Sequence, residues 1–458
     1  MNRHLVHYLV IGLLLVLGPA FARAACESGE EPVRWAIPND EQMLAALAPV
    51  VEDLSSCVVL ESFPVGELFD RYSYELAVGS GGYDLVTLMP AWLGPLSVNL
   101  QAMPVSLYRA NGDTFSPVLE DLMTWEGVHY AQAISGTGLV LYYRADMFAD
   151  PVHQEGFRAI FDAPLAPPET WAQYSEVASY FSQSNQTVQG TGEIYRRGHR
   201  QFWYLYSRAV SLSDDPSPFF NLQDMTPLVD APPWQQALEN YLAMREYNPS
   251  QFLRLTRGQL HDLFTQGEIA MLIDWVDGGP LLRDEASPLP VEALGVVRLP
   301  GSKQRWNADQ QDWIEHEETA PPLLAFGGWL VAVPVKAHDQ SWQALAEIHE
   351  ALAGVIVPPG PYRATQLMTL PGVWSETETG AYIDAVQATL GQGRVGLRLS
   401  GYLAYGETFE LELGKSLIDG RTPEETLAAI KARWMTLTDD FGKENQRTLY
   451  RKSLNLPR

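Results

Sequence analysis

The stretch FTQGEIAMLIDW, Phe264 to Trp275, combines three kinds of local structure within a short length of chain. Its polar first part is typical of a short helix, Gly267-Glu268 of a turn, and the apolar block 269–273 of a buried strand. The strand ends in Asp274-Trp275, which places a hydrogen-bonding group beside a flat apolar face. In open α/β sheets, ligands bind at the carboxyl ends of the strands. We therefore predict that this stretch belongs to an α/β sheet and ends near a ligand site.

Strand-like and helix-like segments alternate along the whole chain, which favours an α/β fold over an all-α or all-β fold. Residues 83–88, 138–143 and 327–334 have the composition of buried strands next to glycine-containing turns. Near the carboxyl end, Thr422 can cap a helix that has Pro423 at its first position, and Glu425 completes a capping box. A chain of 458 residues is too long for one hydrophobic core. We therefore expect at least two α/β lobes.

The amino terminus has the pattern of a secretory signal peptide. Residues 2–4 are a short basic start, 5–17 are an almost unbroken apolar run, and Ala22-Arg23-Ala24 has the small-x-small form of a cleavage site. The apolar run is short for a membrane-spanning helix. We expect residues 1–24 to be a signal peptide that is removed, which leaves a periplasmic protein.

The charge of the chain argues against two classes of partner. The formal net charge is −25, so the chain repels phosphate backbones and anionic lipid head groups. We expect no nucleic-acid or membrane-surface partner, and we interpret the charge as a source of solubility in an exposed compartment.

The chain has two cysteines, Cys26 and Cys57. Each precedes a strand-like run, and residues 40–54 between them have helical spacing. A strand, a helix and a second parallel strand form a right-handed crossover, which places both thiols at one sheet edge. We expect a disulfide whose loop of about 30 residues contributes roughly 3 to 4 kcal/mol in the chain-entropy model. Two inert thiols, or a lipoprotein acylated at Cys26, are the alternatives; Arg23 fits a lipobox poorly.

Five stretches, in this order and spacing, resemble the extracellular solute-binding proteins of bacterial ABC importers. The resemblance is to the large group that includes sugar-binding proteins such as the maltose-binding protein. Each stretch is a weak motif by itself, and the order of all five over most of the chain carries the resemblance. The stretches are 138–148, 167–171, 264–275, 327–333 with the helix from Trp342, and 420–434.

The resemblance implies the periplasmic-binding-protein fold, in which two α/β lobes are joined by a hinge and enclose a ligand cleft. Both lobes would be discontinuous, the first made of 25–135 with 301–358 and the second of 136–300 with 359–458. The chain would cross between them near 133–137, 297–301 and 357–361, and each place carries Gly or Pro, which commonly mark loops.

A cleft for a neutral sugar needs aromatic faces against C–H patches and planar polar groups for the hydroxyls. The chain has 13 Trp and 20 Tyr, most of which must serve the core. The resemblance implies that Tyr204, Trp275 and Tyr402 stack on the ligand, and ordinary packing is the alternative for every candidate. Our candidates are Asn39, Trp92, Gly328 and Trp329 in the first lobe, Ser135 in the hinge, and Tyr204, Asp274, Trp275 and Tyr402 in the second lobe.

Enzyme motifs are absent from the sequence: it has no H-E-x-x-H, G-x-S-x-G or Walker A sequence and no cysteine metal pair. We expect no metal and no cofactor, although a glycosidase needs only two suitably placed carboxylates, which sequence cannot exclude. The acidic insertion 307–318 is expected to be a solvated loop, with a cation or partner site as the alternative; its spacing does not fit a calcium loop.

The expected function is that of a monomeric periplasmic protein that binds a small solute, most simply a carbohydrate, by hinge closure. It would deliver the solute to an ABC permease in the inner membrane. A periplasmic accessory or sensory protein would have nearly the same sequence. A cationic ligand, held by the same aromatic rings and Asp274, is a further alternative.

Overall fold

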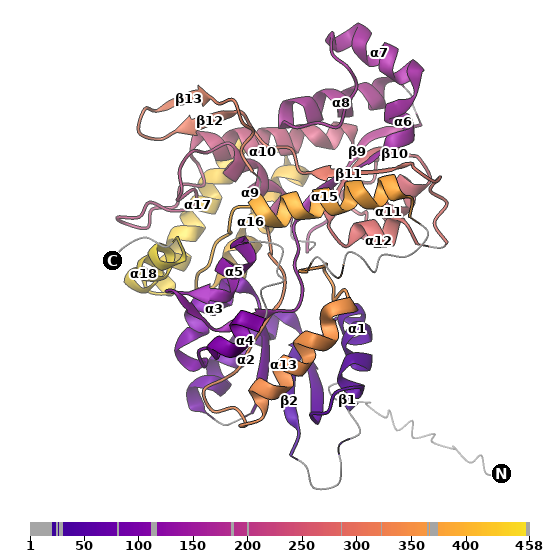
Figure 1. The fold of residues 1–458 in the computed structure, drawn as a ribbon. Helices are drawn as coiled ribbons and strands as arrows, with labels where there is room; N and C mark the ends of the chain where they lie inside the picture. The colour runs from indigo at the N-terminus through magenta and orange to yellow at the C-terminus, as the bar shows by residue number, and fades with distance from the viewer. Residues whose placement is uncertain are drawn as a thin grey trace, which may run out of the picture.

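The chain folds into two α/β lobes, each built on its own sheet (Figure 1). The computed structural model describes residues 21–23, 26, 31–79, 82–110, 117–184, 187–198, 201–284, 286–321, 323–363, 366 and 374–454. Most of the expected signal peptide therefore lies outside the described residues.

The first lobe, in the lower half of Figure 1, is built on a mixed six-stranded sheet. The central pairs are parallel, whereas the outer strands β1, β14 and β7 run antiparallel to their neighbours. In hydrogen-bonding order the strands are β1 (Phe21–Arg23), β3 (Val58–Phe63), β2 (Val33–Pro38), β4 (Leu85–Leu88), β14 (Leu330–Ala332) and β7 (Ala131–Ala133). Strand β1 belongs to the expected signal peptide, so cleavage there would leave β3 at the edge of the sheet.

The helices of the first lobe surround this sheet. In α1 (Glu41–Glu52) the apolar residues follow helical spacing, and the Asp40 side chain caps the helix by accepting a 2.8 Å bond from the Met43 N–H. The other elements are α2 (Val65–Val78), α3 (Pro90–Leu96), η1 (Ser97–Asn99), α4 (Val105–Ala110), α5 (Pro117–Met123), the hairpin β5 (Thr124–Trp125) and β6 (Val128–His129), α13 (Ser341–Ala351) and η3 (Leu352–Gly354).

The second lobe has a four-stranded sheet in which β10 runs antiparallel to β8 and parallel to β9. In order, its strands are β11 (Leu294–Arg298), β8 (Leu139–Arg144), β10 (Ile269–Trp275) and β9 (Gln189–Gly192). Its helices are α6 (Ala145–Ala149), α7 (Pro151–Phe161), α8 (Trp171–Ser184), α9 (Phe202–Ser211), α10 (Pro232–Met244), η2 (Arg245–Tyr247), α11 (Arg257–Thr265), α12 (Gly278–Leu282), α15 (Glu376–Gln392), α16 (Tyr402–Asp419), α17 (Pro423–Asp440) and α18 (Lys443–Ser453).

The stretch Phe264 to Trp275 has the predicted helix-turn-strand form. Helix α11 ends at Thr265, Gly267 turns the chain with φ of +81°, and β10 begins at Ile269. Every residue of β10 except Trp275 is buried, which explains why the strand is a continuous apolar run rather than an alternating one. The predicted capping box at Thr422 and Glu425 also begins α17.

The disulfide between Cys26 and Cys57 is confirmed, with 5.1 Å between the two Cα atoms. The pairing joins the chain before β2 to the start of β3, which are parallel neighbours in the sheet. The expected crossover of strand, helix and strand therefore brings the two thiols to one edge.

The acidic insertion 307–318 is mostly exposed, as expected for a solvated loop, but it includes the turn and second strand of a β-hairpin. Its strands are β12 (Gln304–Asn307) and β13 (Asp312–Glu315), and the rings of Trp306 and Trp313 meet across them with centroids 5.6 Å apart. Cross-strand aromatic pairs stabilise such hairpins. Within the described ranges, no group of three or more His, Cys, Asp or Glu side chains is placed to hold a metal ion.

The hairpin also lies on the second lobe, whereas the boundary expected at residue 301 places it with the first. The Trp306 N–H donates to the Leu212 carbonyl over 2.8 Å, and Arg305 and His316 both reach the Asp214 carboxylate. The chain therefore returns to the first lobe after the hairpin. In the part of the chain that the structure describes, no helix combines the length and apolarity that a membrane crossing requires.

Candidate ligand cleft and hinge

The three segments that connect the lobes run beside one another and form the hinge. The Ile134 N–H donates to the Trp329 carbonyl over 3.0 Å, and Thr137 pairs with Gly327 in an isolated bridge. The Gly136 N–H donates to the Gly360 carbonyl over 3.1 Å. Parts of the segments expected to cross at 133–137 and 357–361 meet here, and they meet residues 327–329, which follow the hairpin.

Two glycines allow this close approach of the backbones. Gly328 has φ of +109°, and a Cβ there would overlap the carbonyl oxygen of Ser135. A Cβ at Gly136 would lie 2.7 Å from the carbonyl oxygen of Pro361. Ser135 itself is fully buried, and its hydroxyl oxygen accepts a 2.9 Å bond from the Trp329 N–H. Ser135, which was predicted in the hinge, and Gly328, which was predicted as a first-lobe site residue, thus both contribute directly to the contact between these segments.

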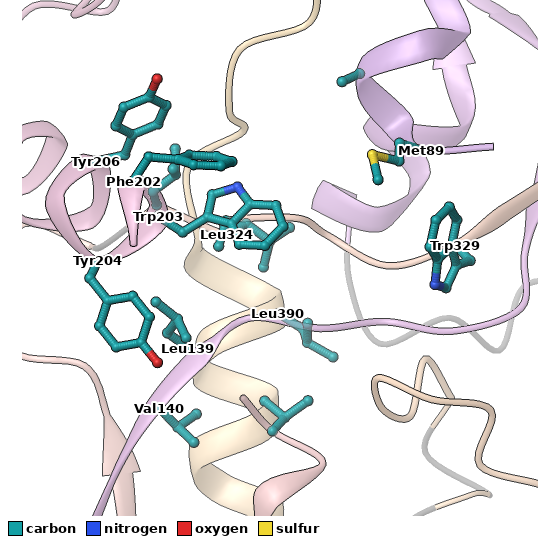
Figure 2. Close-up of a cluster of buried hydrophobic side chains, with 14 of the residues drawn as sticks. Met89, Leu139, Val140, Phe202, Trp203, Tyr204, Tyr206, Leu324, Trp329 and Leu390 are labelled. Atoms are coloured by element: carbon teal, nitrogen blue, oxygen red, sulfur yellow. The ribbon is translucent and has the colours of Figure 1, made fainter. Parts of the chain in front are cut away.

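Aromatic side chains from both lobes and from a crossing segment meet beside the hinge. The ring of Trp203 packs edge-on against Trp275, with centroids 4.9 Å apart, and faces Phe326 at 5.9 Å. Phe326 in turn contacts Trp329 at 4.8 Å, and the Trp203 indole N–H donates to the Tyr402 hydroxyl over 2.7 Å. Figure 2 shows Trp203 on the side of α9, with Met89 and Trp329 on the first-lobe side. We call Trp203, Trp275, Phe326, Trp329 and Tyr402 the interlobe aromatic cluster.

The structure separates the predicted site residues into three groups. Trp275, Trp329 and Tyr402 belong to the interlobe aromatic cluster, and the hinge residues adjoin it. Asn39 is exposed at the end of β2, and Trp92 is buried with its ring 5.7 Å from Phe69, so neither is part of the cluster.

Tyr204 and Asp274 line a second pocket, in the second lobe, together with Trp275. Its volume is about 60 Å³, and Arg257 and His261 contribute to its wall. Tyr204 is buried, and its hydroxyl lies 3.4 Å from the carbonyl oxygen of Ile273. If Tyr204 stacks on a ligand, as the resemblance implies, the ligand must reach its ring through this small pocket.

Sequence reasoning missed Trp203 and Phe326. The run 202–206 is aromatic at four of five positions, and every residue of α9 is buried. Such a helix has no polar face to show which side chains point to the cleft. Adjacent helical residues point in directions about 100° apart, so Trp203 and Tyr204 cannot both face the cleft. Only the tertiary structure shows that Trp203 is the residue that does.

The Asp274 carboxylate is held inside the second lobe by a network of charged side chains. Arg257 Nε lies 2.8 Å and His261 Nε2 lies 2.6 Å from its two oxygens, and Arg257 also binds Asp277. Burial alone would raise the pKa of Asp274, but Arg257 and His261 outweigh it and hold that pKa below its ordinary value. Burial raises the pKa of Asp277 despite the same guanidinium. Asp274 therefore already has partners for both carboxylate oxygens.

One small pocket lies between the lobes in the described part of the chain. A pocket lined by Met89, Pro90, Phe326, Arg398 and Tyr402 has a volume of about 10 Å³, which is room for about one water molecule. A solute larger than water can reach the interlobe aromatic cluster from this side only if the lobes move apart.

Comparison with known proteins agrees with this architecture. A sequence profile of the bacterial extracellular solute-binding proteins matches residues 57–354, which is more than half of the chain. The protein thus belongs to the bacterial extracellular solute-binding proteins. No curated protein sequence matches the chain.

Several solved structures of this class share the fold. Maltose-bound MalE3 of T. maritima is 16% identical, with a TM-score of 0.66 over 89% of this chain and 99% of that one. An ABC transporter solute-binding protein of Agrobacterium radiobacter K84, solved with ribitol, is 20% identical, with a TM-score of 0.65 over 89% and 98%. The sugar-binding protein MalE of Xanthomonas citri is 15% identical, with a TM-score of 0.65 over 90% and 98%.

Replacing Asp274 by Asn tests the charged network. Removing one partner of a buried ion pair costs roughly 3 to 5 kcal/mol, so we expect Asp274→Asn to lose about that much free energy of unfolding at pH 7. A carboxyl whose pKa is lowered by folding stabilises the fold above its unfolded pKa of about 3.9 and loses that contribution as the pH falls. The difference between wild type and variant should therefore shrink below about pH 4.

Urea denaturation at pH 7 and pH 3 measures this difference, with Asp262→Asn as the control because Asp262 is an exposed residue of α11. Equal unfolding free energies for wild type and Asp274→Asn at pH 7 would show that the network contributes nothing to stability.

Proposed function

We propose that this protein is the periplasmic binding component of an ABC import system for a carbohydrate or polyol. The observation that carries the proposal is the interlobe aromatic cluster, which takes rings from the second lobe and from the segment 326–329 that leads into β14. Flat apolar faces with a few polar atoms suit a sugar ring, which presents C–H patches and hydroxyl groups. Maltose and ribitol in two proteins of the same fold support this choice of ligand class.

The proposed binding cycle begins with separation of the lobes, because the pocket beside Phe326 and Tyr402 has a volume of only about 10 Å³. The solute then contacts Trp275 and Tyr402 from the second lobe and Trp329 from the first. Since both lobes contact the solute only when they close on it, binding favours the closed form. The closed protein docks on the inner-membrane permease and releases the solute there.

The amino terminus and the disulfide fit a protein that is exported to the periplasm. Residues 1–24 act as a cleaved signal peptide, and the Cys26–Cys57 disulfide suits the oxidising periplasm. The mature protein acts as a monomer, without catalytic activity and without a nucleic-acid partner.

Replacing Trp275 tests the position of the ligand. Trp275 is the partly exposed member of β10, so its ring has a face to offer a solute. We expect Trp275→Ala to weaken solute binding by roughly 1 to 3 kcal/mol, which is the loss of one buried aromatic contact. Isothermal titration measures the change. Trp313→Ala is the matched control, because Trp313 is also partly exposed but lies in the β12–β13 hairpin. Equal solute affinities of the two variants would show that the solute does not contact Trp275.

A thermal-shift screen of the mature, disulfide-intact protein tests the function itself. A ligand at a hundred times its dissociation constant stabilises the fold by about 2.7 kcal/mol, which raises the unfolding midpoint. We expect a clear rise with one or more mono- or oligosaccharides or polyols. A rise with polyamines or amino acids alone would replace the carbohydrate proposal, and a response to none of these solutes would favour an accessory or sensory role.

A further inference from the structure

The small pocket of the second lobe lies at the edge of the sheet where α/β proteins bind their ligands. Strands β9 and β10 are parallel, so their carboxyl ends lie at the same edge. Ile194 comes shortly after β9, and Asp274 and Trp275 end β10; all three line the pocket. Helix α11 leads through a short turn into β10, which brings its first residue, Arg257, back to this edge. We call this site the Arg257 pocket.

The Arg257 pocket adjoins the proposed solute site, because Trp275 belongs to both. The ring of Trp275 contacts Trp203 in the interlobe aromatic cluster and also lines the pocket. A solute that lies against Trp275 can therefore place one of its substituents in the pocket.

Two carboxylates hold the guanidinium of Arg257 in place. Its Nε donates to Asp274 over 2.8 Å, and its two terminal nitrogens donate to the two oxygens of Asp277. A guanidinium has five N–H groups in one plane, and these bonds use three of them. The side chain of Arg257 is 31% exposed. Two N–H groups thus have no partner among the described residues and can donate to an acceptor atom of a solute, in a direction that the carboxylates fix.

The same two carboxylates outweigh the positive charge of Arg257. Burial lowers the pKa of Arg257, but Asp274 and Asp277 outweigh burial and raise that pKa well above its ordinary value. The formal charges of these three side chains add up to −1, and a protonated His261 would bring the sum to zero. The amino end of α11 adds only about half a positive charge. An anionic group therefore finds no net attraction here to replace its lost hydration.

We propose that the Arg257 pocket receives a neutral hydroxyl-bearing group of the solute, and that Arg257 makes the protein select neutral sugars over acidic ones. The inference rests on the proposed function and deepens it, because it names the kind of carbohydrate. A hydroxyl oxygen can accept from the remaining N–H groups of Arg257. A carboxylate in its place would lie close to Asp274 and Asp277, and like charges at such an interface are strongly unfavourable. An ammonium group has no acceptor atom for these N–H groups.

The size of the pocket limits the group to a small one. A volume of about 60 Å³ has room for a few heavy atoms, since about 10 to 15 Å³ by this measure holds one water molecule. Pockets that enclose a whole small ligand usually begin at about 300 Å³. The apolar walls, from Ile194, Leu260 and the ring of Tyr204, suit the carbon of a hydroxymethyl group. The rest of the solute would lie outside the pocket, against Trp275.

Paired titrations of the mature, disulfide-intact protein test the inference. In each pair a carboxylate replaces one hydroxymethyl group: D-glucose with D-glucuronate, D-galactose with D-galacturonate, and ribitol with ribonate. Any sugar that raises the midpoint in the thermal-shift screen joins the pairs together with its acid form. Isothermal titration at pH 7 uses about 0.15 M salt, which screens exposed charges more than about 8 Å away. We expect the neutral member to bind about tenfold more tightly or better.

Three variants separate the pocket charge from other effects. Asp277→Asn removes one negative charge but keeps an oxygen for Arg257, so we expect it to narrow the preference for the neutral member several-fold. Asp262→Asn is the control, because it makes the same change on the exposed surface of α11 and should leave the preference unchanged. Arg257→Lys keeps the charge but loses the planar set of donors, and it should weaken binding of the neutral member even if Asp277→Asn does not fold.

The possible outcomes distinguish this inference from the proposed function. Equal or tighter binding of the acidic members by the parent protein would overturn the selection for neutral sugars and leave the carbohydrate proposal standing. An unchanged preference in folded Asp277→Asn, or unchanged affinity in Arg257→Lys, would remove the role of the Arg257 pocket. If neither the pairs nor the screen yields a binder, the proposed function itself fails, and the inference that rests on it is overturned too.

Discussion

The close contact of three crossing segments is the constraint on which the rest of the structure depends. Residues 134–137, 327–329 and 360–361 approach one another through backbone atoms, and only glycine at Gly136 and Gly328 leaves enough space. The contact fixes the start of β14 beside β7 and thereby brings Trp329 opposite the second lobe. The same contact keeps the lobes close enough for the rings of Trp203 and Phe326 to pack against each other.

Local signals in the sequence predicted much of the fold. The helix-turn-strand form of 264–275, the capping box at Thr422 and the pairing of Cys26 with Cys57 depend on neighbours in sequence or on adjacent strands. The order of such pieces along the chain was enough for the resemblance to solute-binding proteins, and the family is confirmed. The hairpin of the acidic insertion was missed, because its stability comes from one cross-strand ring pair and from contacts with distant residues.

The cleft was harder to predict, because its composition depends on contacts between segments far apart in sequence. Asp274 and Trp275 follow each other in β10, yet Asp274 is bound by Arg257 and His261 within its lobe while Trp275 faces Trp203. Both residues were candidates from the sequence, but the sequence does not show that Asp274 is already bound by side chains of its own lobe.

The most direct test of this account is a crystal structure of the mature protein with the solute that gives the largest thermal shift. The account predicts the solute between the lobes, against Trp275 and close to Trp329 and Tyr402. A solute bound outside the lobe interface would contradict it, for example in the groove on the second lobe lined by Pro168, Arg298 and Lys303. That result would leave the interlobe aromatic cluster as packing between the lobes.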